Sequence, residues 1–201
     1  MAQKQNFLFL ADHLCLDFVD TEFRRSGEHH DELKTFDDLR EWLKRAGVLA
    51  SIEAVALVRR CHGQAAETVL KGALGLRKAI RQAAQAVADR EPLPAGAIRT
   101  LNTFLSRRAG YFQIERRSSQ FERRFVSPLV EPMMLLAPIA ESAADLLCNG
   151  DLTLVRRCAD ENCDLFFYDT TKNHRRRWCS MSSCGNRAKV AAHRARQKIG
   201  G

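Results

Sequence analysis

The sequence predicts a mainly α-helical protein, in which a helical N-terminal domain with a small β-hairpin precedes a treble-clef-like, four-cysteine zinc finger. Three features predict this: alanine- and leucine-rich helical segments, two equally spaced cysteine pairs, and a basic C-terminal segment without acidic residues. We place the boundary at Asn149-Gly150, which resembles a helix end. The helical domain then spans residues 1–150 and the finger residues 151–201.

The first fifty residues contain one clear helix signal. Thr35 and Asp38 have the spacing of a capping box, so a helix is expected to begin there and to end at Gly47. Residues 7–21 alternate apolar and polar types only loosely, which leaves helix and strand both open. The polar run 29–31 (His-His-Asp) is expected to be a loop.

Four further segments have helical character. One follows Ser51, and residues 65–88 are rich in Ala, Leu, Arg and Gln, which favour helices. The two prolines of segment 91–94 interrupt the chain before a helix at 97–108. Residues 133–148 are apolar and alanine-rich, and they predict the last helix of this domain.

Aromatic and β-branched residues predict a small β-hairpin before that last helix. They occupy residues 111–114 and 121–126, on either side of the polar pair Ser118-Ser119. The N-terminal domain is therefore expected to be mostly helical with one hairpin.

Four of the seven cysteines form two equally spaced pairs. Four residues separate Cys158 from Cys163 and also Cys179 from Cys184, and fifteen residues separate the pairs. This spacing is typical of small zinc modules, because Zn²⁺ prefers four sulfur or nitrogen donors. The polar residues around each pair disfavour the alternative of four unrelated core cysteines. Since four protein ligands leave no open position, the sequence predicts one structural Zn²⁺ rather than a catalytic ion.

The fifteen residues between the pairs predict a hairpin. Residues 165–168 are expected to form one strand, with a polar turn at 169–171 and a return strand through Arg177-Trp178. A knuckle, a hairpin and a following helix together give the treble-clef-like arrangement.

The residues after the second pair predict a helix that runs to about Lys198. Ser182 or Ser183 is the candidate N-cap. Cys184 would then lie in the first turn, where the positive end of the helix faces the thiolates. A stripe of small apolar residues is expected to pack on the aromatic residues of the hairpin; its members are Ala188, Ala191, Ala192, Ala195 and Ile199.

The formal net charge of +8 is concentrated at the C-terminus. Residues 172–201 contain nine Lys or Arg and no acidic residue, which leaves a net charge of −1 on the first 171 residues. A basic end on a nearly neutral body is typical of proteins that bind polyanions, although a solvated basic tail is the alternative. The residues predicted to contact nucleic acid, with double-stranded DNA as the expected form, are Arg175, Arg176, Arg177, Arg187, Lys189, Arg194, Arg196 and Lys198.

The tetrapeptide Cys184-Gly185-Asn186-Arg187, with Trp178-Cys179-Ser180-Met181 before it, resembles the signature of the CGNR zinc-finger family. The resemblance covers about Leu152 to Gln197. It implies a zinc-binding finger in which Arg187 either meets a phosphate or braces the knuckle.

In that family the finger usually follows a helical ABATE domain of stress-responsive transcription regulators. Leu16-Asp17-Phe18-Val19-Asp20-Thr21 resembles the LDFxNT opening of this domain, with Asp20 in place of the usual Asn. The resemblance implies a transcription regulator. Its helical domain would sense a ligand or form a homodimer.

Three polar residues near the start of the chain are candidates for a small-molecule effector pocket. They are His13, Asp17 and Asp20, which lie within eight residues of one another. Surface or capping roles are the alternative.

The sequence favours a binding protein over an enzyme. It contains no GxSxG, HExxH or Walker-type motif. A metal-dependent nuclease would need an acidic partner for His174 or His193, and no acidic residue follows Asp169. The leading hypothesis is a DNA-binding regulator, and the alternative is an RNA- or protein-binding zinc module without sequence-specific readout.

The sequence also favours a cytoplasmic protein without a membrane partner. No stretch approaches the ~20 uncharged apolar residues that span a bilayer. The N-terminus lacks a secretory cleavage pattern. In a reducing compartment, paired cysteines indicate metal binding rather than disulfides.

Overall fold

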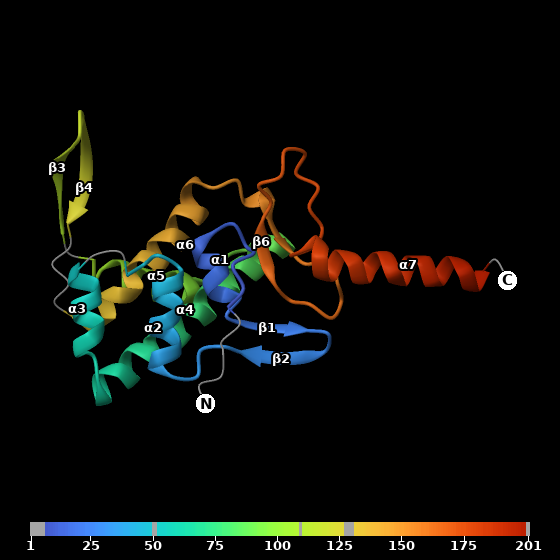
Figure 1. The fold of residues 1–201 in the computed structure, drawn as a ribbon, viewed down its shortest axis with the longest axis horizontal. Coiled ribbons are helices and arrows are strands. Elements are labelled where there is room, and N and C mark those ends of the chain that lie inside the picture. Colours follow the sequence, from blue (N-terminus) through green and yellow to red (C-terminus); the bar gives the residue numbers. More distant parts are fainter. Residues whose placement is uncertain (1–6, 50–51, 109, 127–130, 200–201) are drawn as a thin grey trace.

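In the computed structural model a helical body leads into the finger, and a hairpin and the last helix project from it at opposite ends (Figure 1). The structure describes residues 7–49, 52–108, 110–126 and 131–199. The long helix α4 contacts α1, α2 and α5, and α6 packs on α1 and α5. The helices of the body are α1 (Leu14–Val19), α2 (Phe36–Arg45), α3 (Ile52–Arg60), α4 (Gly63–Asp89), α5 (Ala95–Leu105) and α6 (Ala137–Asn149).

The predicted helices are confirmed, although the residues at which they begin and end differ from the predicted ones. The capping box is present: Asp38 N donates to Thr35 Oγ1 (3.2 Å) and Thr35 N donates to the Asp38 carboxylate (2.7 Å). The segment 133–148 divides into a 3₁₀ turn, η1 (Pro132–Leu136), and α6. Ser51 lies outside the described residues.

The prediction of a loop at 29–31 is wrong. These residues lie in β2 (Glu28–Asp31), which pairs antiparallel with β1 (Glu22–Arg25). The connecting Ser26 and Gly27 both have positive φ (55° and 85°), as a type I′ hairpin turn requires. A polar sequence forms strands here because buried Arg77 holds Asp31 through two hydrogen bonds of 2.8 and 2.9 Å.

The predicted hairpin is confirmed as β3 (Tyr111–Arg117) and β4 (Gln120–Val126). It projects from the body (Figure 1). One face bears the exposed apolar side chains of Phe112, Ile114 and Phe121.

The finger begins with a 3₁₀ turn, η2 (Leu152–Leu154), followed by two short antiparallel strands, β5 (Val155–Arg157) and β6 (Phe166–Tyr168). The predicted pairing of 165–168 with Arg177-Trp178 is therefore wrong, because β6 pairs with the strand before the first cysteine pair. This places the Cys158–Cys163 knuckle at the turn of the hairpin.

The last helix is preceded by a π turn, η3 (Met181–Gly185), and is α7 (Asn186–Ile199). Cys184 lies in η3, the turn that leads directly into α7, and so slightly before the predicted position in the first turn of the helix. The cap residue is Ser180, so the prediction of Ser182 or Ser183 is wrong.

The predicted packing of the alanine stripe on the hairpin is also wrong. Ala191, Ala192 and Ala195 are exposed, and α7 extends away from the body (Figure 1). The hairpin aromatics Phe166 and Phe167 are instead covered by the helical body, since β6 packs on α1. The side chain of Ile199 lies outside the described residues.

The helical body and the finger share one hydrophobic core. Leu165, Phe166 and Phe167 are at most 1% exposed and belong to the same buried cluster as Leu16 and Leu76. In the described part of the chain, no helix has the length and apolar composition needed to cross a membrane.

Candidate metal centre

The four paired cysteines meet in one buried cluster. The knuckle supplies Cys158 and Cys163, the loop before η3 supplies Cys179, and η3 supplies Cys184; all four Sγ atoms lie within 4.8 Å of one another. The distance is 3.8 Å between the Sγ atoms of Cys163 and Cys179 and 3.5 Å between those of Cys179 and Cys184. Four sulfurs at ~2.3 Å from a tetrahedral Zn²⁺ would lie about 3.8 Å apart. The donor set and its geometry fit one structural zinc ion.

The thiols by themselves accommodate little negative charge. Hydrogen bonds from Cys163 and Cys179 lower the pKa of Cys158 to about 2. Hydrogen bonding to Cys158 and burial raise the pKa of Cys163, because a second thiolate beside the first is unfavourable. A divalent cation removes this conflict, since it allows all four sulfurs to be thiolates.

Arg187 braces the metal centre. Its guanidinium donates to Cys184 Sγ (2.9 Å) and, at 2.8 and 3.0 Å, to Asp160 in the knuckle. Burial opposes ionisation of Asp160, but the hydrogen bonds from Arg187 lower its pKa. Arg187 thus joins the helix end to the knuckle, which is one of the two roles that the sequence left open.

Arg176 ties the finger to the first residues of the body. Its guanidinium donates to the carbonyl oxygens of Leu10 and Cys179, each at 2.6 Å, and to the Asp12 carboxylate at 2.6 Å. It also lies over the ring of Phe167, 4.3 Å from the ring centre. This guanidinium is occupied within the protein.

A buried carboxylate, Asp169, orders the loop that carries the basic residues 175–177. It accepts hydrogen bonds from Thr171 N (3.1 Å) and Arg176 N (2.9 Å). Burial opposes its ionisation, but the hydrogen bonds from Thr171 and then Arg176 lower its pKa. This loop is therefore fixed at both ends.

Asp20 lies buried between α1 and the finger. Its Oδ1 accepts a hydrogen bond from Phe166 N (3.0 Å), while its Oδ2 has no hydrogen-bond partner. Burial raises the pKa of Asp20 well above its usual value, although the hydrogen bond and the nearby charge of Arg81 lower it. The family pattern has Asn here, which provides the same acceptor without a charge.

The candidate effector residues make separate structural contacts. His13 Nδ1 lies 3.1 Å from Ser142 Oγ, Asp17 accepts a hydrogen bond from Ala11 N (2.9 Å), and Asp20 contacts the finger. Burial raises the pKa of Asp17 to about 6. Other side chains line the cleft beside the end of α4 and the small apolar cavity between α4 and α6.

The predicted nucleic-acid residues divide into two groups. Arg176 and Arg187 are engaged within the protein, as described above. The side chain of Lys198 lies outside the described residues. The others are exposed: Arg175, Arg177, Lys189, Arg194 and Arg196.

Three residues at the junction of the body and the finger were missed by the sequence reasoning. Arg24 N donates to Asp164 Oδ1 (2.6 Å), and Arg81 Nη1 lies 3.9 Å from Asp164 Oδ2. Arg81 also donates to the carbonyl oxygens of Val19 (2.9 Å) and Glu22 in the body. No local pattern marks these residues, because their partners are distant in sequence. Asp20, which the sequence marked as a departure from the family pattern and a candidate pocket residue, lies at the same junction.

Comparison with known families confirms the resemblance seen in the motifs. Residues 12–150 match the ABATE family, whose description is "Putative stress-induced transcription regulator". Residues 155–197 match the CGNR zinc finger. No curated protein matches the chain.

Proposed function

Because the chain belongs to the ABATE family and carries a CGNR finger with one structural zinc ion, we propose that it is a cytoplasmic, non-catalytic, DNA-binding transcription regulator. In this proposal α7 and the loop before it contact DNA. The helical body senses a ligand or binds a second copy.

The exposure of α7 is the observation that favours DNA. The helix extends from the body (Figure 1), and residues 189–197 are exposed on every side. Because residues 189–197 are all exposed, this part of the helix is free to enter the major groove of B-DNA, which is wide enough to admit a helix. Cys184 in η3 and Arg187 at the start of α7 tie the base of the helix to the zinc centre.

The side chains of α7 suit a phosphate-lined groove. The alanine stripe is flanked by Arg194 on one side and by Lys189 and Arg196 on the other. Small side chains allow close approach of the helix to base edges, and the flanking cations can reach the phosphates. Arg175 and Arg177 add exposed charge at the base of the helix.

Fluorescence anisotropy across a salt series tests the proposal. The probes are the duplex upstream of the protein's own coding sequence, a scrambled duplex and a single-stranded RNA. We expect tighter binding to the upstream duplex with a steep salt dependence, because each neutralised phosphate adds about 0.9 to the slope.

A matched pair of variants locates the interface. Replacing Lys189, Arg194 and Arg196 by Gln should lower the salt slope by up to about 3. Replacing the exposed body residues Arg59, Lys71 and Arg99 by Gln removes the same charge and should leave the slope unchanged.

Two outcomes would contradict DNA recognition. Preference for the single-stranded RNA would favour the RNA-binding alternative. Absence of binding to all three probes would favour a protein partner.

A further inference from the structure

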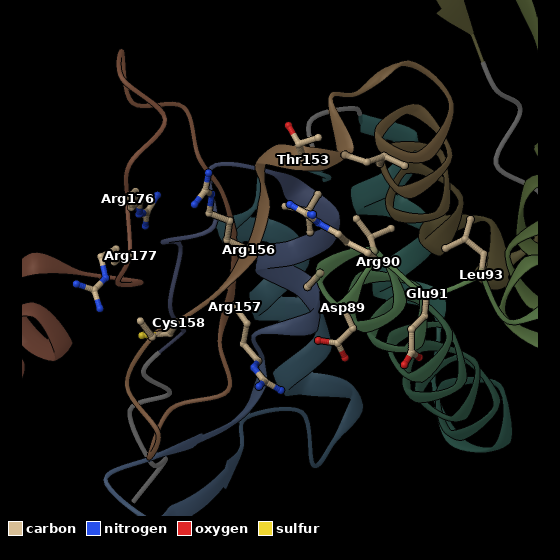
Figure 2. Close-up of a pocket in the computed structure, with 15 residues that line it drawn as sticks. Asp89, Arg90, Glu91, Leu93, Thr153, Arg156, Arg157, Cys158, Arg176 and Arg177 are labelled. Carbon is tan, nitrogen blue, oxygen red and sulfur yellow. The ribbon is translucent and has the colours of Figure 1, made fainter.

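A cleft of about 780 Å³ separates the end of α4 from the finger. Figure 2 shows Asp89, Arg90 and Glu91 at the end of α4, opposite Arg156 and Arg157 on β5. Cavities of this size suit small organic ligands. Because both the body and the finger form its walls, a molecule bound here would contact both.

The cleft has an excess of positive charge. Five arginines line it, against the two carboxylates of Asp89 and Glu91; the arginines are Arg90, Arg156, Arg157, Arg176 and Arg177. Three of the five have partners within the protein. Arg176 makes the contacts described above, and Arg177 lies over Trp178, with its guanidinium 4.9 Å from the ring centre. Arg156 donates to the carbonyl oxygen of His174 (3.0 Å), and its Nε lies 3.6 Å from the buried Asp169 carboxylate.

Two arginines of the cleft remain uncommitted. Of the described carboxylates, none forms an ion pair with Arg90 or Arg157. In Figure 2 Arg90 extends from the end of α4 toward Arg156, so that two cationic groups face each other. Facing cations with spare hydrogen-bond donors are suited to an anion that accepts from both, and arginine favours phosphate.

The backbone of Arg90 supports a role for its side chain. Arg90 ends α4 in the left-handed conformation (φ 60°, ψ 36°), where glycine is the usual residue. Arginine is strained there, and strained residues are concentrated at binding sites.

The remaining lining accommodates an organic group. Val87, Leu93, Leu152 and Val155 provide apolar surface beside the arginines. An inorganic ion would leave this surface uncovered, whereas a phosphate ester would cover it.

We propose that this cleft binds a small phosphate ester, with Arg90 and Arg156 holding the phosphate and the apolar side chains holding the organic group. The cleft adjoins the metal centre, since Cys158 is part of its lining, but none of its lining residues belongs to α7. The proposed ligand binding does not depend on DNA binding.

Isothermal titration calorimetry of the zinc-loaded full chain tests the site with ADP, pyrophosphate and adenosine. We expect ADP to bind with a dissociation constant on the order of micromolar, pyrophosphate more weakly, and adenosine not at all. ADP should also raise the melting temperature. Absence of ADP binding at millimolar concentration, or equal binding of adenosine, overturns the proposal.

Arg90→Gly separates a ligand role from a structural one. Glycine prefers the left-handed conformation, so the variant should be at least as stable as the parent, yet ADP affinity should fall about tenfold or more. Arg99→Gln is the control, because Arg99 is exposed on α5 outside the cleft. Unchanged ADP affinity in Arg90→Gly overturns the assignment.

A nucleic-acid backbone is the other source of phosphate. If Arg90→Gly weakens duplex binding while ADP fails to bind, the cleft serves DNA phosphates and the small-ligand proposal is wrong. Loss of ADP affinity with unchanged duplex affinity supports it.

Discussion

The arginines of the finger form two populations that differ in environment rather than in type. Arg176 and Arg187 are engaged within the protein, where they donate to carbonyl oxygens, carboxylates and a cysteine sulfur. Arg175, Arg194 and Arg196 are exposed, and α7 lies clear of the body. A single basic segment can therefore hold a small module together with some of its arginines and offer a polyanion-binding surface with the others.

Removing a zinc ligand should produce the largest effect. Cys184→Ser should release the metal and unfold the finger, because metal binding supplies about 10–16 kcal/mol to the folding of small zinc modules. Metal content by mass spectrometry and circular dichroism measure this. Cys148→Ser, which changes an exposed cysteine outside the cluster, should retain full zinc; full zinc in Cys184→Ser would refute the site.

The second-largest effect is expected from replacing Arg176, whose guanidinium is engaged within the protein. Arg176→Gln should lower the free energy of unfolding by about 2–4 kcal/mol, because it leaves the carbonyl oxygens of Leu10 and Cys179 without their donor. Arg175→Gln should change it by less than about 0.5 kcal/mol. Equal effects in urea unfolding of the two zinc-loaded variants would abolish the distinction between the two populations.

Replacing Arg187, which braces the metal centre, should have a smaller effect than replacing Cys184 or Arg176. Arg187→Gln removes the donor to Cys184 Sγ and the ion pair with Asp160. We expect zinc transfer to a chelator to be about 10–100-fold faster, as for other groups that support metal ligands. Arg194→Gln, on the same helix but exposed, provides the comparison and should leave the transfer rate unchanged.

The smallest effect concerns the buried carboxyl at the junction. Because burial raises the pKa of Asp20, the folded chain holds a proton that the unfolded chain releases, and stability falls as the pH rises from the unfolded value toward the folded one. Asp20→Asn keeps the acceptor for Phe166 N and removes the cost of ionising a buried carboxyl group. We therefore expect it to stabilise the folded chain by about 1 kcal/mol at pH 8.

The pH dependence of the stabilisation by Asp20→Asn shows whether it arises from the ionisation of Asp20. Comparing Asp20→Asn with the parent at each pH cancels the contribution of the cysteines. The gain should shrink as the pH falls from 8 to 5.5, and a gain independent of pH would mean that ionisation of Asp20 is not its source.

Local patterns in the sequence determined the helices α2 to α6, the β3–β4 hairpin and the zinc ligands, but they left α1 open between helix and strand. Helix propensity and capping are short-range effects, so Thr35 and Asp38 located α2 without knowledge of the rest of the chain. The cysteine spacing was equally informative, because zinc accepts few ligand sets and each pair closes a short loop.

Contacts between distant segments decided the rest. β6 pairs with β5 and packs on α1, which leaves nothing for the alanine stripe of α7 to cover, and the knuckle forms at the turn of that hairpin. The inward positions of Arg176 and Asp20 depend on partners more than 140 residues away. Residue type and periodicity carry no information about such partners, because burial of a charged group is favourable only when the folded chain supplies its hydrogen bonds. The tertiary structure therefore separated the arginines that hold the finger in place from those that are free to bind.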